Sequence, residues 1–413
     1  MPRVLAVYAN PPYPPDQAMR TPQWHHLTAV ATMADVTILT WQSPDVSDSD
    51  LRALRSVSSD ILIAPWRGRT HSLMSRVRRQ WRFFVGGEPH YVQALAEERG
   101  LNGGEGVAWL RREIDRRHAA DPYDLIILGE DALARIPLPR LEGVPVLVHR
   151  WNSFSSIVGD LQRATGHGVR RRIEARGWRR FDTTVTARAD LVVTPTPEVA
   201  LEVARIAPAT RTVCVPNGVS REQLVTPPSG GGDLAFIGAM DYAANIDAVE
   251  WFARECWPEL RARFPESTFR VIGRKPGDRV RALDGNGIRI VGAVDSLEAA
   301  TEGARVGVVP LRAGMGIKNK TLELMAMGLP VVTLPSGSEG IAASAEDGLI
   351  TVETAAAFVA AVADLLDDPA GADRLGSAAR RYVRRHHSWE EARDRYRRHV
   401  EGLISVHRAN LVP

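Results

Sequence analysis

The chain has 413 residues, a formal net charge of +3 and 44% hydrophobic residues. This length suits two globular domains of about 200 residues each better than one core. The balanced charge gives no support to a nucleic-acid role, no apolar run approaches the roughly 20 residues that span a bilayer, and two cysteines are too few for a disulfide framework or a cysteine-ligated metal site.

Short apolar strands alternate with helical patterns through the first half of the chain. The strands are predicted over residues 4–8, 35–40, 60–64, 123–128, 144–148, 189–194 and 211–215. This alternation is typical of a doubly wound α/β domain with a parallel sheet. The loop after the first strand then lies at the ligand edge of the sheet, and Arg20 there is either an anion contact or a solvated residue at a helix start.

Residues 163–188 contain eight arginines but only one Glu and one Asp, with apolar residues between them. Such a segment can lie on an anionic membrane surface, where each basic residue contributes about 1 kcal/mol. It can equally be the solvated face of a helix, and the sequence leaves both interpretations open. Since no signal-peptide pattern precedes the first strand, we expect a cytoplasmic protein, with peripheral contact at the inner membrane face as the open alternative.

A Pro-, Ser- and Gly-rich stretch at residues 221–233 predicts a linker, after which the alternation restarts. Strands are predicted over residues 234–238, 269–272, 288–291 and 348–352, and helices over 245–264, 297–302, 355–366 and 373–387. The tail from residue 389 has the pattern of a charged helix. We therefore expect an N-terminal domain over residues 1–216, a second domain over 217–388 and a C-terminal helix over 389–413.

The second domain is organised around residues 306–341. An apolar run at 306–310 predicts a strand, Gly314 and Gly316 end it, a helical pattern follows over 320–327, and 330–334 has the pattern of another strand. In a parallel β-α-β unit, the loop and the first helical turn lie at the carboxyl edge of the sheet. Free N–H groups and the helix dipole favour a phosphate at that edge.

The lysines indicate the same loop. The chain has three lysines against forty-nine arginines; Lys318 and Lys320 lie in the loop, and Lys275 follows the strand at 269–272. A chain that otherwise uses arginine is expected to keep lysine where a compact ammonium serves better, and phosphate charge is such a case. Chance clustering is the alternative. Glu323, one turn into the helix, is placed to reach a ribose diol.

The run GMGIKNKTLELMAMGLPVVTLPSGSEGI, residues 314–341, resembles the signature of the group 1 glycosyl transferases, the retaining glycosyltransferases of family 4. That signature has a loop, Lys-x-x-Glu, a small-residue helix, Gly-x-Pro-Val-Val and a Gly-x-Glu-Gly turn. The resemblance implies the GT-B fold, in which two Rossmann-like domains with doubly wound parallel sheets face each other across a cleft. It also implies sugar transfer from a nucleotide-diphosphate donor, with UDP or GDP as the carrier, without a metal or other cofactor.

The resemblance assigns roles residue by residue. In the family, the ribose is held by the second Glu of a Glu-x7-Glu pair, which matches Glu323; the first matches Met315, so the carboxylate expected on the donor sugar is absent. His149 matches a strand-end histidine near the donor sugar and the acceptor. The catalytic candidates are His149, Lys320 and Glu323. The donor-binding candidates are Arg20, Gly238, Arg274, Val294, Gly314, Met315, Gly316, Ile317, Lys318 and Glu323.

The expected partners are a nucleotide-sugar donor and an acceptor that is a polysaccharide, a lipid-linked sugar or a small natural product. Two other functions share the expected fold. A non-hydrolysing nucleotide-sugar epimerase would turn over without an acceptor, and a non-catalytic relative would bind a nucleotide diphosphate but leave the donor intact. The loss at Met315, and an Arg and Lys pair missing from the loop after residues 234–238, keep the second alternative open. An NAD-dependent enzyme fits worse, because no Gly-x-Gly-x-x-Gly follows the first strand.

Overall fold

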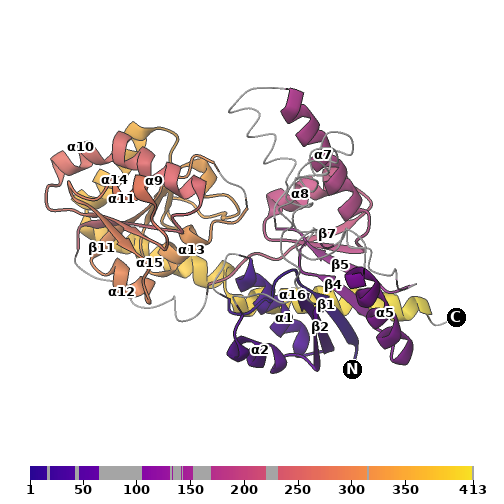
Figure 1. Ribbon diagram of the computed structural model, residues 1–413. Coiled ribbons are helices and arrows are strands. Elements are labelled where there is room, and N and C mark those ends of the chain that lie inside the picture. Colours follow the sequence, from indigo (N-terminus) through magenta and orange to yellow (C-terminus); the bar gives the residue numbers. More distant parts are fainter. Residues whose placement is uncertain are drawn as a thin grey trace. The chain divides into compact units, whose positions relative to one another are not determined.

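The computed structural model describes residues 1–15, 19–41, 46–64, 105–130, 133, 141, 143–151, 169–219, 231–313 and 316–411. The chain divides into two compact units. Unit 1 comprises Met1–Val215 and Arg393–Pro413, and unit 2 comprises Pro216–Ala392. In Figure 1, the elements of unit 2 run from salmon through orange toward yellow, while unit 1 combines the indigo and magenta elements with the yellow C-terminal end of the chain.

Unit 1 is built on a parallel sheet of seven strands in the order β3-β2-β1-β4-β5-β6-β7. Four-residue runs such as Leu-Ile-Ile-Leu in β4 are buried along their whole length, as expected for a parallel sheet covered on both faces. The strands are β1 (Arg3–Val7), β2 (Asp35–Trp41), β3 (Asp60–Ala64), β4 (Leu125–Leu128), β5 (Val146–His149), β6 (Leu191–Thr194) and β7 (Arg211–Cys214). The helices are α1 (Arg20–Ala31), α2 (Asp48–Arg55), α5 (Glu105–Ala120), α7 (Val169–Thr186), α8 (Pro197–Ile206) and most of α16 (Trp389–Leu411).

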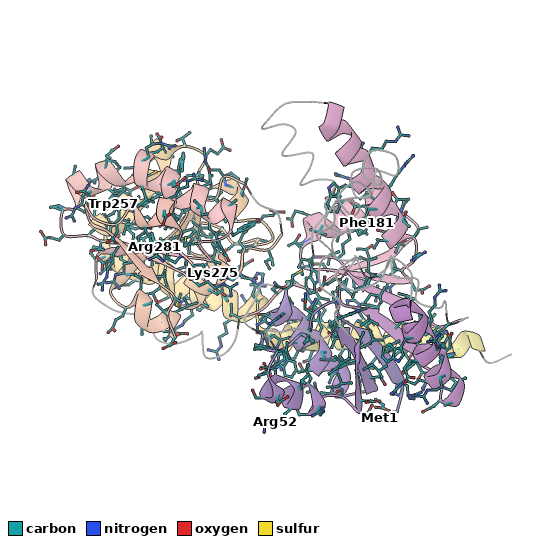
Figure 2. All side chains as sticks on the ribbon, viewed as in Figure 1. Met1, Arg52, Phe181, Trp257, Lys275 and Arg281 are labelled. Carbon is teal, nitrogen blue, oxygen red and sulfur yellow. The ribbon has the colours of Figure 1, made fainter. Side chains whose placement is uncertain are left out.

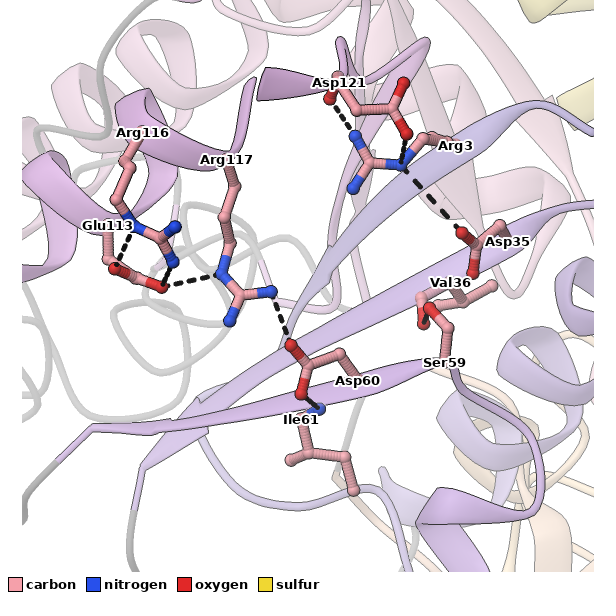
Figure 3. A network of polar contacts seen from close by, with 10 residues as sticks. All are labelled: Arg3, Asp35, Val36, Ser59, Asp60, Ile61, Glu113, Arg116, Arg117 and Asp121. Carbon is pink, nitrogen blue, oxygen red and sulfur yellow. Dashed lines mark hydrogen bonds and ion pairs between the residues drawn. The ribbon is translucent and has the colours of Figure 1, made fainter. Parts of the chain in front are cut away.

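Ion pairs connect α5, which was not predicted from the sequence, to the sheet of unit 1 (Figure 3). Arg117 donates from Nε to Glu113 of the same helix (2.7 Å) and from a terminal nitrogen to Asp60 at the start of β3 (2.5 Å). Just after the helix, the carboxylate of Asp121 lies 3.0 Å from Nε of Arg3 in β1. These side chains are partly exposed, so the pairs orient α5 more than they stabilise the fold.

Residues 163–188 could be a membrane-binding segment or a solvated helix, and the α7 helix shows where two of their apolar side chains lie. Phe181 (labelled in Figure 2) and Trp178 are buried in the core of unit 1, with their rings 5.8 Å apart, whereas Arg179 and Arg180 are exposed. These two apolar side chains are therefore core residues and are not available to a membrane. Residues 161–168 lie outside the described part of the chain. Among the described residues, no helix is both long enough and apolar enough to cross a bilayer.

Unit 2 is built on a parallel sheet of six strands in the order β10-β9-β8-β11-β12-β13. Its strands are β8 (Asp233–Ile237), β9 (Phe269–Ile272), β10 (Ile288–Gly292), β11 (Ala304–Val309), β12 (Val331–Thr333) and β13 (Leu349–Thr351). Its helices are α9 (Ala243–Glu255), α10 (Trp257–Arg263), α11 (Asp278–Arg281), α12 (Leu297–Thr301), α13 (Asn319–Ala326), α14 (Ala355–Asp367) and α15 (Pro369–His386). Phe252, Phe269 and Phe358 meet between the sheet and the helices, and burying each such side chain contributes about 1.5–3 kcal/mol.

The single helix predicted over residues 245–264 is wrong. The chain forms α9 and α10 with a break at Cys256, because Pro258 has no N–H to donate and fits only in the first turn of a new helix. Trp257 (labelled in Figure 2) begins that helix, and its indole N–H donates to the carbonyl of Asn286 (2.9 Å).

The last helix, α16, contributes to both units. Trp389 to Ala392 belong to unit 2, and the chain from Arg393 onward belongs to unit 1. In unit 1, Tyr396 is fully buried and stacks on His26 with ring centroids 4.1 Å apart. Further along, Nε of Arg408 donates to the carboxylate of Asp124 at the start of β4 (2.7 Å).

Candidate functional site

The candidate site in unit 2 lies where the strand order reverses. β8 and β11 are neighbours at the centre of the sheet, and their connections leave in opposite directions. Gly238 directly follows β8, and the glycine loop that leads into α13 follows β11. In open parallel sheets, ligands bind at the carboxyl ends of the strands at such a switch point.

Lys320 lies in the first turn of α13, and its ammonium is held by two other elements. Its Nζ donates to Oδ1 of Asn245 on α9 and lies 4.8 Å from the ring centre of Phe236 on β8. Burial lowers the pKa of Lys320 to about 7, an effect that Glu323 opposes and Lys318 reinforces. At neutral pH this lysine is therefore divided between its charged and uncharged forms, and a bound phosphate would favour the charged form.

Glu323 lies one turn further along α13 and is half-buried. Burial raises the pKa of its carboxyl, while Lys320 counteracts that shift. No described residue donates a hydrogen bond to this carboxylate. Both oxygens are therefore open to accept hydrogen bonds from a ligand hydroxyl, as a ribose diol requires.

Lys318 has different surroundings. Its buried ammonium donates to the carbonyl of Gly316 (2.6 Å) and to Oε2 of Glu339 (3.1 Å), and Oε1 of Glu339 accepts from the N–H of Gly316 (3.2 Å). The pair thus closes the end of the glycine loop against the Gly-x-Glu-Gly turn. The charge of Lys318 is compensated in this arrangement, so Lys320 is the cation of the loop with a neutral partner.

Two threonines place the turn that carries Glu339. The hydroxyl of Thr321 on α13 donates to the carbonyl of Gly337 (2.7 Å), and that of Thr333 at the end of β12 donates to the carbonyl of Val309 (2.8 Å). A Cβ at Gly337 would lie 2.1 Å from the Thr333 hydroxyl, so only glycine fits there. Glu339 therefore reaches Lys318 because the turn is fixed on both sides.

The remaining predicted donor contacts in unit 2 are spread over neighbouring strand ends. Arg274 is exposed, and its carbonyl accepts from the N–H of Met240 (2.9 Å); Val294 and Ile317 are half-buried. The predicted residues Gly314 and Met315 lie outside the described part of the chain. Lys275 (Figure 2) is exposed, and its ammonium lies 3.2 Å from the carboxylate of Asp241.

Gly273 shows how tightly the strand ends approach each other. A Cβ at Gly273 would lie 1.7 Å from the carbonyl oxygen of Gly238, a distance that no rotamer change relieves. We expect Gly273→Ala to lower the free energy of unfolding of unit 2 by about 1–3 kcal/mol, measured by chemical denaturation. Gly277→Ala, where a Cβ has open space around it, is the matched control and should change stability by less than about 0.5 kcal/mol. Equal stability of the two variants would contradict the close approach.

The predicted residues of the N-terminal half lie in unit 1. His149 ends β5 and is completely buried; its ring centroid is 4.9 Å from that of His26 and 5.3 Å from that of Tyr396. Neither ring nitrogen has a hydrogen-bond partner among the described residues, and burial lowers the pKa of His149 to about 3. The imidazole is therefore neutral and packed as an aromatic side chain. Arg20 is buried at the first position of α1.

The structure thus brings Gly238, Lys318 and Lys320 together with Glu323 on α13, and it places His149 and Arg20 in the other unit. Sequence reasoning missed two residues of the site. Asn245 lies in the loop and helix start where a basic pair was expected and not found, and Glu339 was noted only as part of a turn motif. Among the described residues, no group of three or more His, Cys, Asp or Glu side chains could hold a metal ion. Metal independence remains a prediction.

Residues 231–368 match the family model of the glycosyl transferases of group 1. No curated protein sequence matches the chain. Among solved structures, sucrose-phosphate synthase from Thermosynechococcus elongatus is similar, with a TM-score of 0.66, 17% identity, and coverage of 98% of this chain and 100% of that chain. An S. aureus TarM variant in complex with fondaparinux, alpha-GlcNAc-glycerol and UDP has a TM-score of 0.64 and 9% identity, covering 98% of this chain and 100% of that chain.

Anabaena HepE in complex with UDP and glucose is similar as well, with a TM-score of 0.63, 11% identity, and coverage of 97% of this chain and 100% of that chain. Identities this low show the fold, and the two parallel-sheet units confirm the predicted GT-B class. The matched domain and these neighbours together support glycosyl transfer as the activity.

Proposed function

We propose that the protein is a retaining glycosyltransferase of family 4 that needs no metal and moves a sugar from a nucleotide-diphosphate donor to an acceptor hydroxyl. The observation that carries the proposal is the cation at the β8 and β11 strand ends. Lys320 is fixed there by Asn245, and Glu323, whose carboxylate accepts no hydrogen bond from the described residues, follows one turn later on the same helix. These two groups match the two ends of a nucleoside diphosphate, the phosphates and the ribose.

The chemistry requires that negative charge on the departing diphosphate be stabilised. As the bond from the anomeric carbon to the phosphate oxygen breaks, Lys320 and the positive end of the α13 dipole stabilise the developing charge. The acceptor oxygen bonds to the anomeric carbon on the face that the phosphate leaves, and the acceptor proton passes to the leaving phosphate. This route needs no protein base, which agrees with a buried His149 whose pKa is lowered to about 3 and which therefore binds a proton weakly.

The donor carries UDP or GDP in this proposal, and the neighbours solved with UDP favour the first. The acceptor is a sugar hydroxyl on a growing polysaccharide, a lipid carrier or a small natural product. Gly238 would line the donor phosphates, and Arg274 and Val294 would lie beside the base.

A thermal-shift panel of UDP, GDP, ADP and TDP tests the proposal. One diphosphate at about 100 times its Kd should stabilise the folded state by roughly 2.7 kcal/mol and raise the melting temperature accordingly. Glu323→Ala should lose most of that shift, because the ribose hydroxyls lose their acceptor. Each variant is compared with its own unliganded form, so a change in intrinsic stability does not enter the result.

Glu346→Ala is the matched control, since this glutamate of unit 2 is exposed. It should keep the full shift. Failure of every diphosphate to stabilise the wild type would contradict donor binding. A diphosphate that binds while the donor stays intact with every acceptor would indicate the non-catalytic alternative.

A further inference from the structure

Asn245 makes two side-chain hydrogen bonds at the end of β8. It is 4% exposed, its Nδ2 donates to the carbonyl of Ala239 (2.8 Å), and its Oδ1 accepts from the ammonium of Lys320. The first bond fixes the orientation of the amide, because only the nitrogen can donate to a carbonyl. The oxygen is therefore left facing Lys320.

Gly238 leaves room for this pair. A Cβ at that position would lie 2.8 Å from Nδ2 of Asn245 and 3.0 Å from Nζ of Lys320. Both side chains thus pack directly against the backbone at the strand end. The ring of Phe236 lies on another side of the ammonium, with its centre 4.8 Å from Nζ. The lysine stem is long and flexible, so these contacts decide where its charge is.

We propose that Asn245 is a positioning residue that holds the ammonium of Lys320 at the β8 strand end, where it meets the diphosphate of the donor. This inference rests on the proposed function. The amide is neutral, so it fixes the ammonium without cancelling its charge. Lys318 shows the contrast, because its partner Glu339 is a carboxylate.

The charged groups around Lys320 also shift its pKa, so their effects must be known before the effect of Asn245 is predicted. Glu323 on the same helix raises the pKa of Lys320, Lys318 lowers it, and burial dominates and brings it to about 7. The negative charge of Glu298 raises the pKa of Glu323. An amide oxygen that accepts from the ammonium favours the charged form. Removing that oxygen must therefore lower the pKa of Lys320 further, whereas a carboxylate in its place must raise it.

The three lysines of the chain make a direct measurement practical. With lysine labelled at the ε-carbon, the wild-type protein gives three NMR signals to follow through a pH titration. We expect the midpoint of Lys320 to fall by about 1 pH unit in Asn245→Ala and to rise by about 1 unit in Asn245→Asp. The melting temperature of each variant without ligand reports that it is folded.

Binding of inorganic pyrophosphate is the second readout. We expect Asn245→Ala to weaken it about tenfold at pH 7, because both the position and the charge of Lys320 are lost. Glu250→Ala, on an outer turn of α9 where Glu250 pairs with Arg279, is the control and should bind pyrophosphate as the wild type does.

The outcomes separate this inference from the function on which it rests. Equal Lys320 midpoints in the wild type and both Asn245 variants, with pyrophosphate binding intact, overturn the role of Asn245 and leave the transferase standing. A wild type that binds neither pyrophosphate nor any nucleoside diphosphate overturns the proposed function, and the positioning role with it.

Discussion

Lys320→Ala is expected to lower kcat/KM for sugar transfer by about 100- to 1,000-fold. The ammonium is the one cation that the described part of the candidate loop presents with a neutral partner, and removing one preorganised group that stabilises a leaving oxyanion typically has an effect of this size. Steady-state kinetics with the donor found in the thermal-shift panel provides the measurement. Because the charge develops as the donor bond breaks, kcat should fall more than the affinity for the donor.

Two further variants make this result specific. Lys320→Arg should restore only a small part of the activity, because a planar guanidinium cannot occupy the place of a compact ammonium between Asn245 and the ring of Phe236. Arg279→Ala removes an exposed cation of the same unit and should leave the rate unchanged. A loss of less than threefold in Lys320→Ala would rule out the assigned role.

Arg150→Ala is expected to lower the free energy of unfolding of unit 1 by about 3–5 kcal/mol. Arg150 follows β5 and is 1% exposed; its guanidinium pairs with Asp182 on α7, which is completely buried, and donates to the hydroxyl of Thr186 (2.9 Å). Truncating the arginine breaks a buried ion pair from one side, which is among the largest effects of a single substitution. Denaturant titration of the whole chain gives the measurement.

The double variant Arg150→Met with Asp182→Leu is the control, because it removes both charges and refills the space. Replacement of a buried ion pair by apolar side chains is often neutral, so this variant should stay within about 1 kcal/mol of the wild type. If the single and the double variant were equally destabilised, lost packing and not the broken ion pair would be responsible.

The sheets could be predicted from the sequence because their strands are continuous apolar runs. The predicted segments overlap all strands of the seven-stranded and the six-stranded sheet. The position of the candidate site could be predicted for the same reason, because the glycine loop directly follows one of these apolar runs. The helix over 245–264 failed because apolar spacing continues across Pro258, while the missing N–H of proline ends the helix.

The contacts that complete the site could not be read from the sequence. Asn245 meets Lys320 across 75 positions, and Lys318 meets Glu339 across 21, so no local pattern links the partners. The burial of His149 depends on Tyr396, which comes from the last helix. The burial of Arg150 could not be predicted from the sequence either, because an arginine after a strand is usually solvated.

The shared helix α16 has a consequence for biosynthesis. Unit 2 is continuous in sequence, whereas unit 1 is completed by residues from Arg393 onward, including Tyr396 beside His26 and His149. A nascent chain leaves the ribosome from its N-terminus, and domains usually fold in that order. Here the order is reversed at the final step: the second unit can be complete while the first still exposes two histidine rings, until the last segment emerges and covers them.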